Sequence, residues 1–441
     1  MVRHCEEGAD METTLKKEQA GRREALKAAG VGFTTSLFTG RIRGANDRIA
    51  LAFLGVGGMG NYNLTLAMRQ PQVAVVGLCD VYQTNLERAV AAATAGGHQP
   101  KAVKDFRHVL ADKSVDAVCI CTPDHWHALM TVEACKAGKD VWVEKPVCVT
   151  VNEGQKMVLA ARKYNRVVQA GTMQRSGDVF QKATELVRGG RLGKITFCRT
   201  WNYGLMDEKG MGNPPDSDPP PGLDWNMWLG PAPFRPYNKN RCIFNFRWFW
   251  DYAGGMMTDW GVHWMDIVQM AFNETMPLAI TALGGIYYLK DNRETPDTLS
   301  VTYEYPGFLA TYEWRAGNAE SMFKQGGGIL FHGNKGTLFV TRSHYTVVPE
   351  KGSDLEPIEE KRINDANLAH WANFLECMRT RQKPISDIET GYRSTATCLL
   401  GNVALRSKMH VDWDAKKETT LQESARSYLT REYRAPWKLV V

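Results

Sequence analysis

The chain has 441 residues, of which 44% are hydrophobic, 23% charged and 10% aromatic, and this average composition excludes a disordered, collagen-like or coiled-coil protein. The net charge is +6, and the sequence has no run of five basic residues. Such a thinly spread charge argues against a nucleic-acid partner and favours a small-molecule ligand. No run of 18 apolar residues is present, so a membrane-spanning helix is not expected either, and the length suits two domains.

Residues 1–45 are typical of a targeting segment rather than of a folded domain. Arg22 and Arg23 precede a weakly apolar run over 28–38, which is too short to cross a bilayer and is followed by a Gly/Arg-rich stretch. This order predicts an export signal of the twin-arginine type, which would carry a folded protein to the periplasm or the exterior. The alternative is a disordered basic tail on a cytoplasmic enzyme.

A buried strand over 49–54 leads directly into a glycine turn and then into a helix over 61–69. Strand, G-x-G-x-x-G turn and helix, in this order, are the fingerprint of a dinucleotide-binding unit. The reason is that the turn lets a pyrophosphate approach the N–H groups at the start of the helix. The first cofactor candidates are therefore the residues of the turn, Gly55, Gly57, Gly58, Met59 and Gly60.

A second apolar run, over 73–79, ends in Asp80, which lies 20 residues after the last glycine of the turn. A carboxylate at this position accepts hydrogen bonds from the adenosine ribose and repels a 2′-phosphate. The sequence therefore predicts NAD as the cofactor, with NADP less favoured.

Strands and helices continue to alternate as far as residue 170. Such an alternation predicts a doubly wound parallel sheet over residues 46–170, in which ligands bind beyond the carboxyl ends of the strands. The further strands are expected over 117–121, 141–143 and 167–170, and the helices over 86–95, 106–110, up to 137, and 152–164.

Two polar segments follow two of these strands, Thr122-Pro123-Asp124-His125-Trp126-His127 and Glu144-Lys145-Pro146. Lys145 precedes a proline of fixed φ at a strand end, where a cation can orient a nicotinamide or bind a hydroxyl; a plain surface turn is the alternative. With the glycine turn and Asp80, these motifs resemble the Gfo/Idh/MocA oxidoreductases, named for glucose-fructose oxidoreductase, inositol dehydrogenase and a rhizopine-catabolism protein, over residues 46–441. The further cofactor candidates are Thr122, Pro123, His127, Glu144, Lys145 and Gln174.

No metal site or disulfide framework is expected. The ten cysteines lie mostly in apolar runs without a C-x-x-C pair and are read as buried thiols. His125 and His127 have no third ligand at a compatible spacing, so they more often cap or pack than bind a metal.

From residue 171 the pattern changes to a long irregular stretch over 202–252, rich in proline and tryptophan. Aromatic side chains on a proline-stiffened loop suit the apolar faces of a sugar ring, but they equally suit an interface arm that packs its own aromatics. The candidates for substrate binding are Arg175, Tyr203, Trp248, Asp259, Trp260 and His263.

A helix is expected after the glycine pair at 254–255. On it, Asp259, His263 and Asp266 share one face, beside an apolar flank, which favours a face lining a cavity. A helix-surface ion pair of Asp259 with His263 is the alternative. The resemblance places Asp259 and His263 on the positions of the family's catalytic Asp and His.

Residues 171–441 are predicted to form an α+β domain with a largely antiparallel open sheet, because successive strands follow without helices between them. The resemblance implies a homo-oligomer through this sheet. The strands are expected over 195–201, 279–289, 299–305, 309–314, 328–331 and 337–340, with helices up to 188, over 366–380 and over 388–405.

The resemblance implies NAD-dependent oxidation of a secondary hydroxyl of a sugar, glycoside or cyclitol. His263 would take the hydroxyl proton, Asp259 would orient His263 or bind a hydroxyl, and Lys145 would polarise the reacting oxygen and hold the cofactor. Because no pool of free NAD exists outside the cytoplasm, an exported protein would keep its cofactor tightly bound. The alternatives are an NAD-dependent glycoside hydrolase that works by transient oxidation and elimination, and a non-catalytic protein that binds a sugar or NAD.

Overall fold

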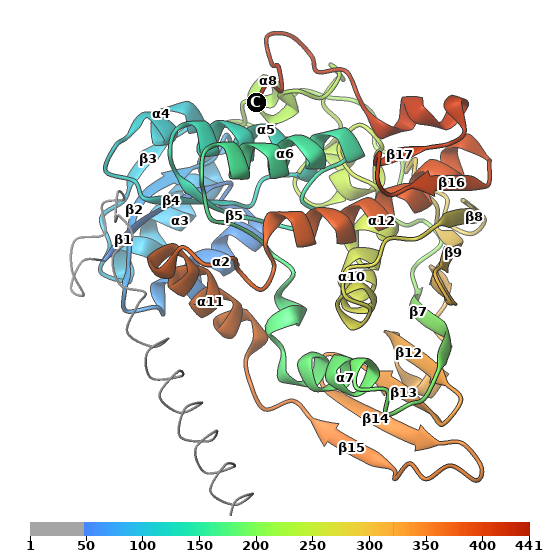
Figure 1. The fold of residues 1–441 in the computed structure, drawn as a ribbon. Helices are drawn as coiled ribbons and strands as arrows, with labels where there is room; N and C mark the ends of the chain where they lie inside the picture. The colour runs from blue at the N-terminus through green and yellow to red at the C-terminus, as the bar shows by residue number, and fades with distance from the viewer. Residues whose placement is uncertain (1–47, 321) are drawn as a thin grey trace, which may run out of the picture. The chain divides into compact units, whose positions relative to one another are not determined.

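The computed structural model describes residues 48–320 and 322–441, so the expected export signal in residues 1–45 lies outside them. Residues 46–441 belong to one structural unit built on two sheets (Figure 1). No helix of the described residues has the length and apolar character needed to cross a membrane.

The first sheet confirms the doubly wound Rossmann arrangement, with six parallel strands in the order β3-β2-β1-β4-β5-β6. β4 and β5 are buried along their whole length, as expected for strands with helices on both faces. The strands are β1 (Ile49–Leu54), β2 (Val73–Cys79), β3 (Lys101–Val103), β4 (Ala117–Ile120), β5 (Asp140–Val143) and β6 (Val168–Ala170). The helices are α2 (Gly58–Met68), α3 (Gln83–Ala95), α4 (Phe106–Ala111), α5 (Asp124–Lys136) and α6 (Val151–Lys163).

The second sheet has eleven strands, and its neighbours are antiparallel except for β7 and β10, which confirms a largely antiparallel sheet. Burial alternates along β9, so one face packs on the core and the other is open. Its strands are β7 (Ile195–Leu205), β8 (Ala279–Gly285), β9 (Thr298–Tyr305), β10 (Phe308–Arg315), β11 (Gly317–Asn318), β12 (Gly327–Gly333), β13 (Gly336–Val340), β14 (His344–Pro349), β15 (Ile358–Lys361), β16 (Val411–Asp414) and β17 (Thr419–Thr420). The remaining α-helices are α7 (Asp178–Arg188), α8 (Trp225–Leu229), α9 (Gly255–Asp259), α10 (Gly261–Ala271), α11 (Ala366–Thr380) and α12 (Ile388–Ser407).

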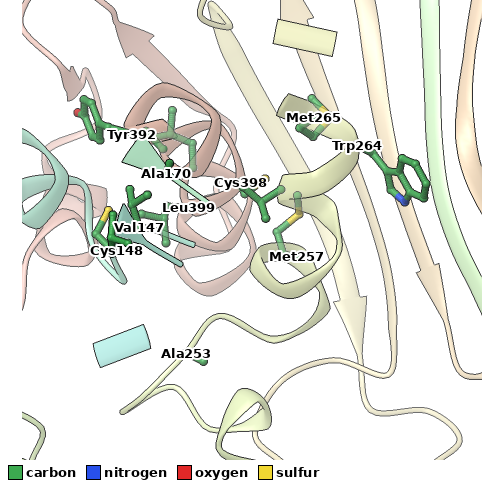
Figure 2. Packing of buried hydrophobic residues seen from close by; sticks show 14 of the residues in the cluster. Val147, Cys148, Ala170, Ala253, Met257, Trp264, Met265, Tyr392, Cys398 and Leu399 are labelled. Atoms are coloured by element: carbon green, nitrogen blue, oxygen red, sulfur yellow. The ribbon is translucent and has the colours of Figure 1, made fainter. Parts of the chain in front are cut away.

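Helix α12 joins the two sheets through one hydrophobic core. It packs on α6 and β6 of the Rossmann unit and on α9, α10 and β8 of the second half. Figure 2 shows Tyr392 with Cys148 and Ala170, and Cys398 toward Met257. The close approach requires Gly391, because a Cβ there would overlap the methyl group of Ala170. The strand ends of the first sheet are therefore held against the helices of the second half.

Helix α11 completes the Rossmann core from the other half of the chain. Its Trp371 stacks on Trp142 of β5, with ring centroids 4.2 Å apart and an interplanar angle of 6°. The Trp371 indole N–H donates to the Asn63 side-chain oxygen of α2 at 3.0 Å. A boundary near residue 171 thus separates the two sheets but not two independent cores.

Residues 220–247, here called the cover segment, lie against the loop that follows β2. The Gln83 N–H donates to the Gly222 carbonyl at 3.0 Å, and the Asp224 N–H donates to the Val81 carbonyl at 3.0 Å. Tyr82 and Leu223 form a β-bridge between these two bonds. The irregular stretch expected from the sequence is therefore tied by backbone hydrogen bonds to the Rossmann unit.

Residues 431–437, here called the strap, bind the Rossmann helices and the cover segment together. Arg431 donates to the His125 carbonyl at 2.6 Å and to the Glu153 carboxylate of α6 at 2.7 Å. Arg434 donates to the Gly230 carbonyl at 3.0 Å, at the end of α8. The strap thus anchors the cover segment at a second place.

The packing of Trp371 predicts that Trp371→Ala lowers the free energy of unfolding by about 3–5 kcal/mol, because a buried indole and its stacking partner are lost. Denaturant titration of the full chain measures the loss. Leu159→Ala is the control, since Leu159 is 57% exposed and a surface substitution changes stability by roughly 0.5 kcal/mol or less. Equal effects of the two substitutions would contradict the shared core.

Candidate active site

The glycine turn after β1 provides an anion-binding helix start. Gly55 has φ of +82°, and a Cβ there would come within 2.8 Å of the Thr122 nitrogen. Gly60 packs directly on the Gly55 carbonyl, whereas a Cβ at Gly58 would meet open space. No side chain caps the first N–H groups of α2, so they are available to a phosphate.

A cavity of about 410 Å³ lies between the carboxyl ends of the Rossmann strands and the cover segment. Asp80 sits at one end, where its carboxylate accepts the Val56 N–H at 2.9 Å and the Tyr82 N–H at 2.8 Å. The Thr122 hydroxyl is buried in the wall without a hydrogen-bond partner among the described residues. The carboxylate of Asp80, the uncapped N–H groups of α2 and the unpaired hydroxyl of Thr122 are the kinds of group that bind the ribose, the phosphates and the polar atoms of a dinucleotide. The predicted cofactor residues that line this cavity are Gly55, Gly57, Gly58, Met59, Asp80, Thr122, Pro123, His127, Glu144 and Lys145.

Two predicted cofactor residues do not line this cavity. Gly60 is buried against the Gly55 carbonyl, so its role is in packing the turn. Gln174 is buried between its neighbours: its amide donates to the His263 carbonyl at 2.8 Å and its oxygen accepts a bond from Arg342 at 2.8 Å. The prediction of Gln174 as a cofactor ligand is therefore replaced by a positioning role.

The two histidines of the H-x-H pair, His125 and His127, contact backbone carbonyl oxygens. The His127 ring nitrogens lie 2.7 Å from the Pro146 carbonyl and 2.8 Å from the Thr122 carbonyl, which ties the two motif segments together. The His125 Nε2 lies 3.0 Å from the Trp228 carbonyl. Within the described residues, no group of three His, Cys, Asp or Glu side chains is arranged to hold a metal ion.

A second cavity of about 240 Å³ adjoins the first and extends toward α10. Trp260, His263 and Arg342 line it from the second half, with Trp371 at the other side. The residues lining both cavities are Met59, Glu144, Lys145, Phe244, Arg247 and Asp259. The predicted catalytic residues Lys145 and Asp259 therefore lie where the cavities meet, and His263 lines the second cavity alone.

Lys145 and Asp259 form an ion pair between the two halves of the chain. The Lys145 Nζ lies 2.9 Å from the Asp259 Oδ1 and 2.8 Å from its carbonyl oxygen, and the Arg247 Nε lies 3.3 Å from the same Oδ1. Burial by itself would raise the pKa of Asp259, but the charges of Lys145 and Arg247 outweigh it and hold the pKa below its ordinary value. Asp259 is thus an ionised anchor for two cations.

The continuous helix expected over this region is broken at Trp260, between α9 and α10. The break turns Asp259 toward Lys145, and no hydrogen bond or ion pair joins Asp259 to His263 among the described residues. The predictions that Asp259 orients His263, or pairs with it on the helix surface, are therefore wrong. Asp266, expected on the same face, binds Arg175 instead.

His263 enters the second cavity as a neutral imidazole. Burial, followed by the positive charges of Arg342 and Lys145, holds the pKa of His263 well below its usual value of 6.5. Its Nδ1 is buried without a hydrogen-bond partner in the described part of the chain. The lowered pKa keeps the ring unprotonated at neutral pH, which is the form in which an imidazole can accept a proton.

Three predicted substrate residues lie away from both cavities. Arg175 is buried in ion pairs with Asp266 at 2.8 Å and Glu274 at 2.7 Å, so its guanidinium holds α10 rather than a ligand. The Tyr203 hydroxyl donates to Glu313 at 2.5 Å. Trp248 is buried, and its backbone carbonyl accepts a hydrogen bond. These substrate assignments are corrected to structural roles, whereas Trp260 does line the second cavity.

Three charged residues at the site were not predicted from the sequence. Asp124 begins α5, and burial raises its pKa to about 7 against the opposing charges of Arg247 and Lys145. Arg247 lies within the irregular stretch, and Arg342 lies in the turn between β13 and β14, where no local pattern distinguishes it from a surface residue. Their roles follow only from tertiary contacts.

Two family models match the chain. The oxidoreductase family model for the NAD-binding Rossmann fold matches residues 49–172, and the model for the C-terminal alpha/beta domain matches residues 194–439. The chain belongs to the Gfo/Idh/MocA oxidoreductase family. Residues 49–172 accordingly form an NAD-binding Rossmann domain, and the glycine turn and Asp80 of this domain line the first cavity.

Several proteins with named functions are similar to this chain. A scyllo-inositol 2-dehydrogenase (NAD(+)) of Bacillus subtilis is 24% identical over 386 residues, covering 85% of this chain and 98% of its own length. A glycosyl hydrolase family 109 protein of Saccharopolyspora erythraea is 31% identical over 160 residues, covering 35% of this chain and 34% of its own length. For the first curated relatives, of which this hydrolase is one, the match covers less than half of the relative's own length. The WlbA dehydrogenase of Bordetella pertussis, solved with NADH and UDP-GlcNAcA, shares the fold at a TM-score of 0.62 with 19% identity, covering 83% of this chain and 99% of that chain.

The buried ion pairs of Arg175 predict that Arg175→Met lowers the free energy of unfolding by about 3–5 kcal/mol, because Asp266 is left as an uncompensated buried charge. Denaturant titration measures the change. The double variant Arg175→Met with Asp266→Asn is expected to recover part of the loss, since the fully buried Asp266 no longer carries an unpaired charge and only the partly exposed Glu274 does. A double variant less stable than the single variant would show that the charge is not the cause.

Proposed function

We propose that this protein is an NAD-dependent oxidoreductase that acts on a secondary hydroxyl of a sugar, glycoside or cyclitol. The observation that carries the proposal is the second cavity, which is lined by the neutral His263 and meets the cavity beside Asp80 at Lys145 and Asp259. The family supports a redox reaction, and the scyllo-inositol 2-dehydrogenase relative supports a polyhydroxylated ring as the substrate.

Each residue of this cluster has a part in the reaction. Bound NAD would accept a hydride from the alcohol carbon. Lys145 donates a hydrogen bond to the reacting oxygen and Asp259 keeps Lys145 in place, while His263 accepts the hydroxyl proton. The C–H and O–H bonds of the alcohol break, the carbonyl forms, and hydride and proton leave to separate acceptors.

The cover segment supports a firmly held cofactor. Leu223, Cys242 and Phe244 line the first cavity from above the strand ends, and the backbone bonds at Gly222 and Asp224 fasten the segment beside Asp80. An enclosed NAD favours a cycle that returns its hydride, so glycoside cleavage by transient oxidation and elimination is the second candidate. Export by a twin-arginine route and oligomerisation through the second sheet stay predictions.

The redox proposal is tested on the purified full chain. We expect nicotinamide nucleotide in the supernatant of the denatured protein at about one per chain, and a rise in absorbance at about 340 nm when a suitable sugar is added. His263→Ala is expected to reduce the rate of nucleotide reduction by about 10²–10⁴-fold while the nucleotide stays bound, because His263 lines only the second cavity.

The control for that variant is His332→Ala, a half-buried histidine on β12 that lines neither cavity. Unchanged turnover in His263→Ala would refute its role as base. Cleavage of glycosides with no net nucleotide reduction would replace the dehydrogenase proposal with the hydrolase. Binding of sugars without any redox or cleavage activity would favour the non-catalytic alternative, a protein that only binds a sugar or NAD.

The lowered pKa of His263 predicts a pH profile. His263 is the proton acceptor only when neutral, so kcat/KM is expected to stay flat down to pH 6.5 and to fall only at lower pH. Arg342→Gln removes one charge that lowers this pKa, so the acidic limb should move to higher pH. The control is Asp124→Asn, which removes any ionisation near pH 7 that belongs to Asp124. A wild-type limb at or above pH 6.5 that persists in Asp124→Asn would contradict the burial argument.

A further inference from the structure

Arg342 is a cation of the second cavity without a counter-ion. Its Nε donates to the Gln174 oxygen at 2.8 Å, and its guanidinium carbon lies 4.6 Å from the centroid of the Trp260 ring. Across residues 48–320 and 322–441, no carboxylate lies within ion-pair distance of Arg342, and its Nη2 is buried without a hydrogen-bond partner. Burial lowers the pKa of Arg342 to about 10, which leaves it charged at neutral pH.

The other charged groups of this cavity are already paired. Lys145 and Arg247 share the carboxylate of Asp259. The Glu144 carboxylate accepts hydrogen bonds from Asn63 at 2.9 Å and Trp142 at 3.2 Å. Of the described residues that line the cavity, three are cations and two are carboxylates, which leaves a surplus of one positive charge, and Arg342 is the cation without an ion-pair partner.

Arg342 is half-buried and lines the second cavity. A charge that is partly removed from water is costly unless it is paired, which is why buried charges are paired in most proteins. A ligand bound in the cavity can supply the negative charge that Arg342 lacks.

Arg342 and the proposed base lie along one wall. Trp260 stacks under the guanidinium and contacts the His263 ring edge to face, with centroids 5.6 Å apart. Gln174 links the same two residues from behind, since it accepts from Arg342 and donates to the His263 carbonyl. The spacing between anion site and base is therefore held by buried contacts, as specificity requires.

We propose that the substrate is an acidic sugar and that Arg342 binds its carboxylate, while the hydroxyl to be oxidised lies at Lys145 and His263. This inference rests on the function proposed above. A carboxylate is favoured over a phosphate, because the one surplus positive charge of the cavity lining matches a single negative charge. A dianionic phosphate would leave a second charge without a partner in a cavity of about 240 Å³.

The test compares matched sugars on the full chain with NAD bound. D-glucuronate and D-galacturonate are compared with D-glucose and D-galactose, and with the hexose 6-phosphates, in both calorimetric binding and kcat/KM. We expect the uronates to exceed the neutral sugars by about 10–100-fold, the range of a hydrogen bond to a charged group. In Arg342→Gln this ratio should fall to near one, mainly through KM. Arg315→Gln is the matched control, because Arg315 also stacks on an aromatic ring, that of Tyr203, but lines neither cavity.

The outcomes separate the two proposals. Preference for neutral sugars or for hexose phosphates in the wild type, or a uronate preference that survives in Arg342→Gln, overturns the carboxylate site. If neutral sugars reduce the nucleotide while uronates do not bind, the redox function stands and the carboxylate site fails. If uronates bind in a manner that depends on Arg342 but no nucleotide is reduced, the carboxylate site stands and the redox function fails.

Discussion

The ion pair of Lys145 and Asp259 connects the two halves of the molecule at the point where the two cavities meet. Its side chains are only 9% and 19% exposed, so neither charge is well solvated and each depends on the other. Removing either partner would leave a buried charge in the wall of the first cavity. The pair therefore connects the two halves of the chain. Its Asp259 also binds Arg247, and its Lys145 helps to lower the pKa of His263.

Such a pair needs the two halves of the chain to be held at a fixed distance, and the packing between them provides this. Helix α12 places side chains against both β6 and α10, and α11 contributes Trp371 to the Rossmann core. Glu144, next to the ion pair, is oriented by Trp142 and by Asn63, which also binds Trp371. The geometry at the strand ends therefore depends on residues more than 200 positions away in the sequence.

Local signals predicted the Rossmann half well, because each of its elements carries its own pattern. The strand over 73–79 was placed at its observed bounds, and the glycine turn with Asp80 identified the first cavity. In the second half, the strands from β7 to β13 other than the two-residue β11 and the helices α11 and α12 were placed near their observed bounds, whereas β14 to β17 were not predicted, since they are partly exposed and most are short. The break at Trp260 was missed because the periodicity continues through it. Arg342 could not be predicted as a site residue from the sequence. It lies in the turn between β13 and β14, and only the tertiary structure brings this turn to a cavity that other elements line.

The strap over residues 431–437 has a consequence for the order of folding. It anchors the cover segment through Arg434 and the Rossmann helices through Arg431, yet it is synthesised about 200 residues after the cover segment. Domains usually fold during synthesis from the N-terminus onward. Here the Rossmann strands can be made early, but the strap that anchors the cover segment is made only after nearly the whole chain. The contacts that hold the cover segment are therefore completed later than the sheet it lies against.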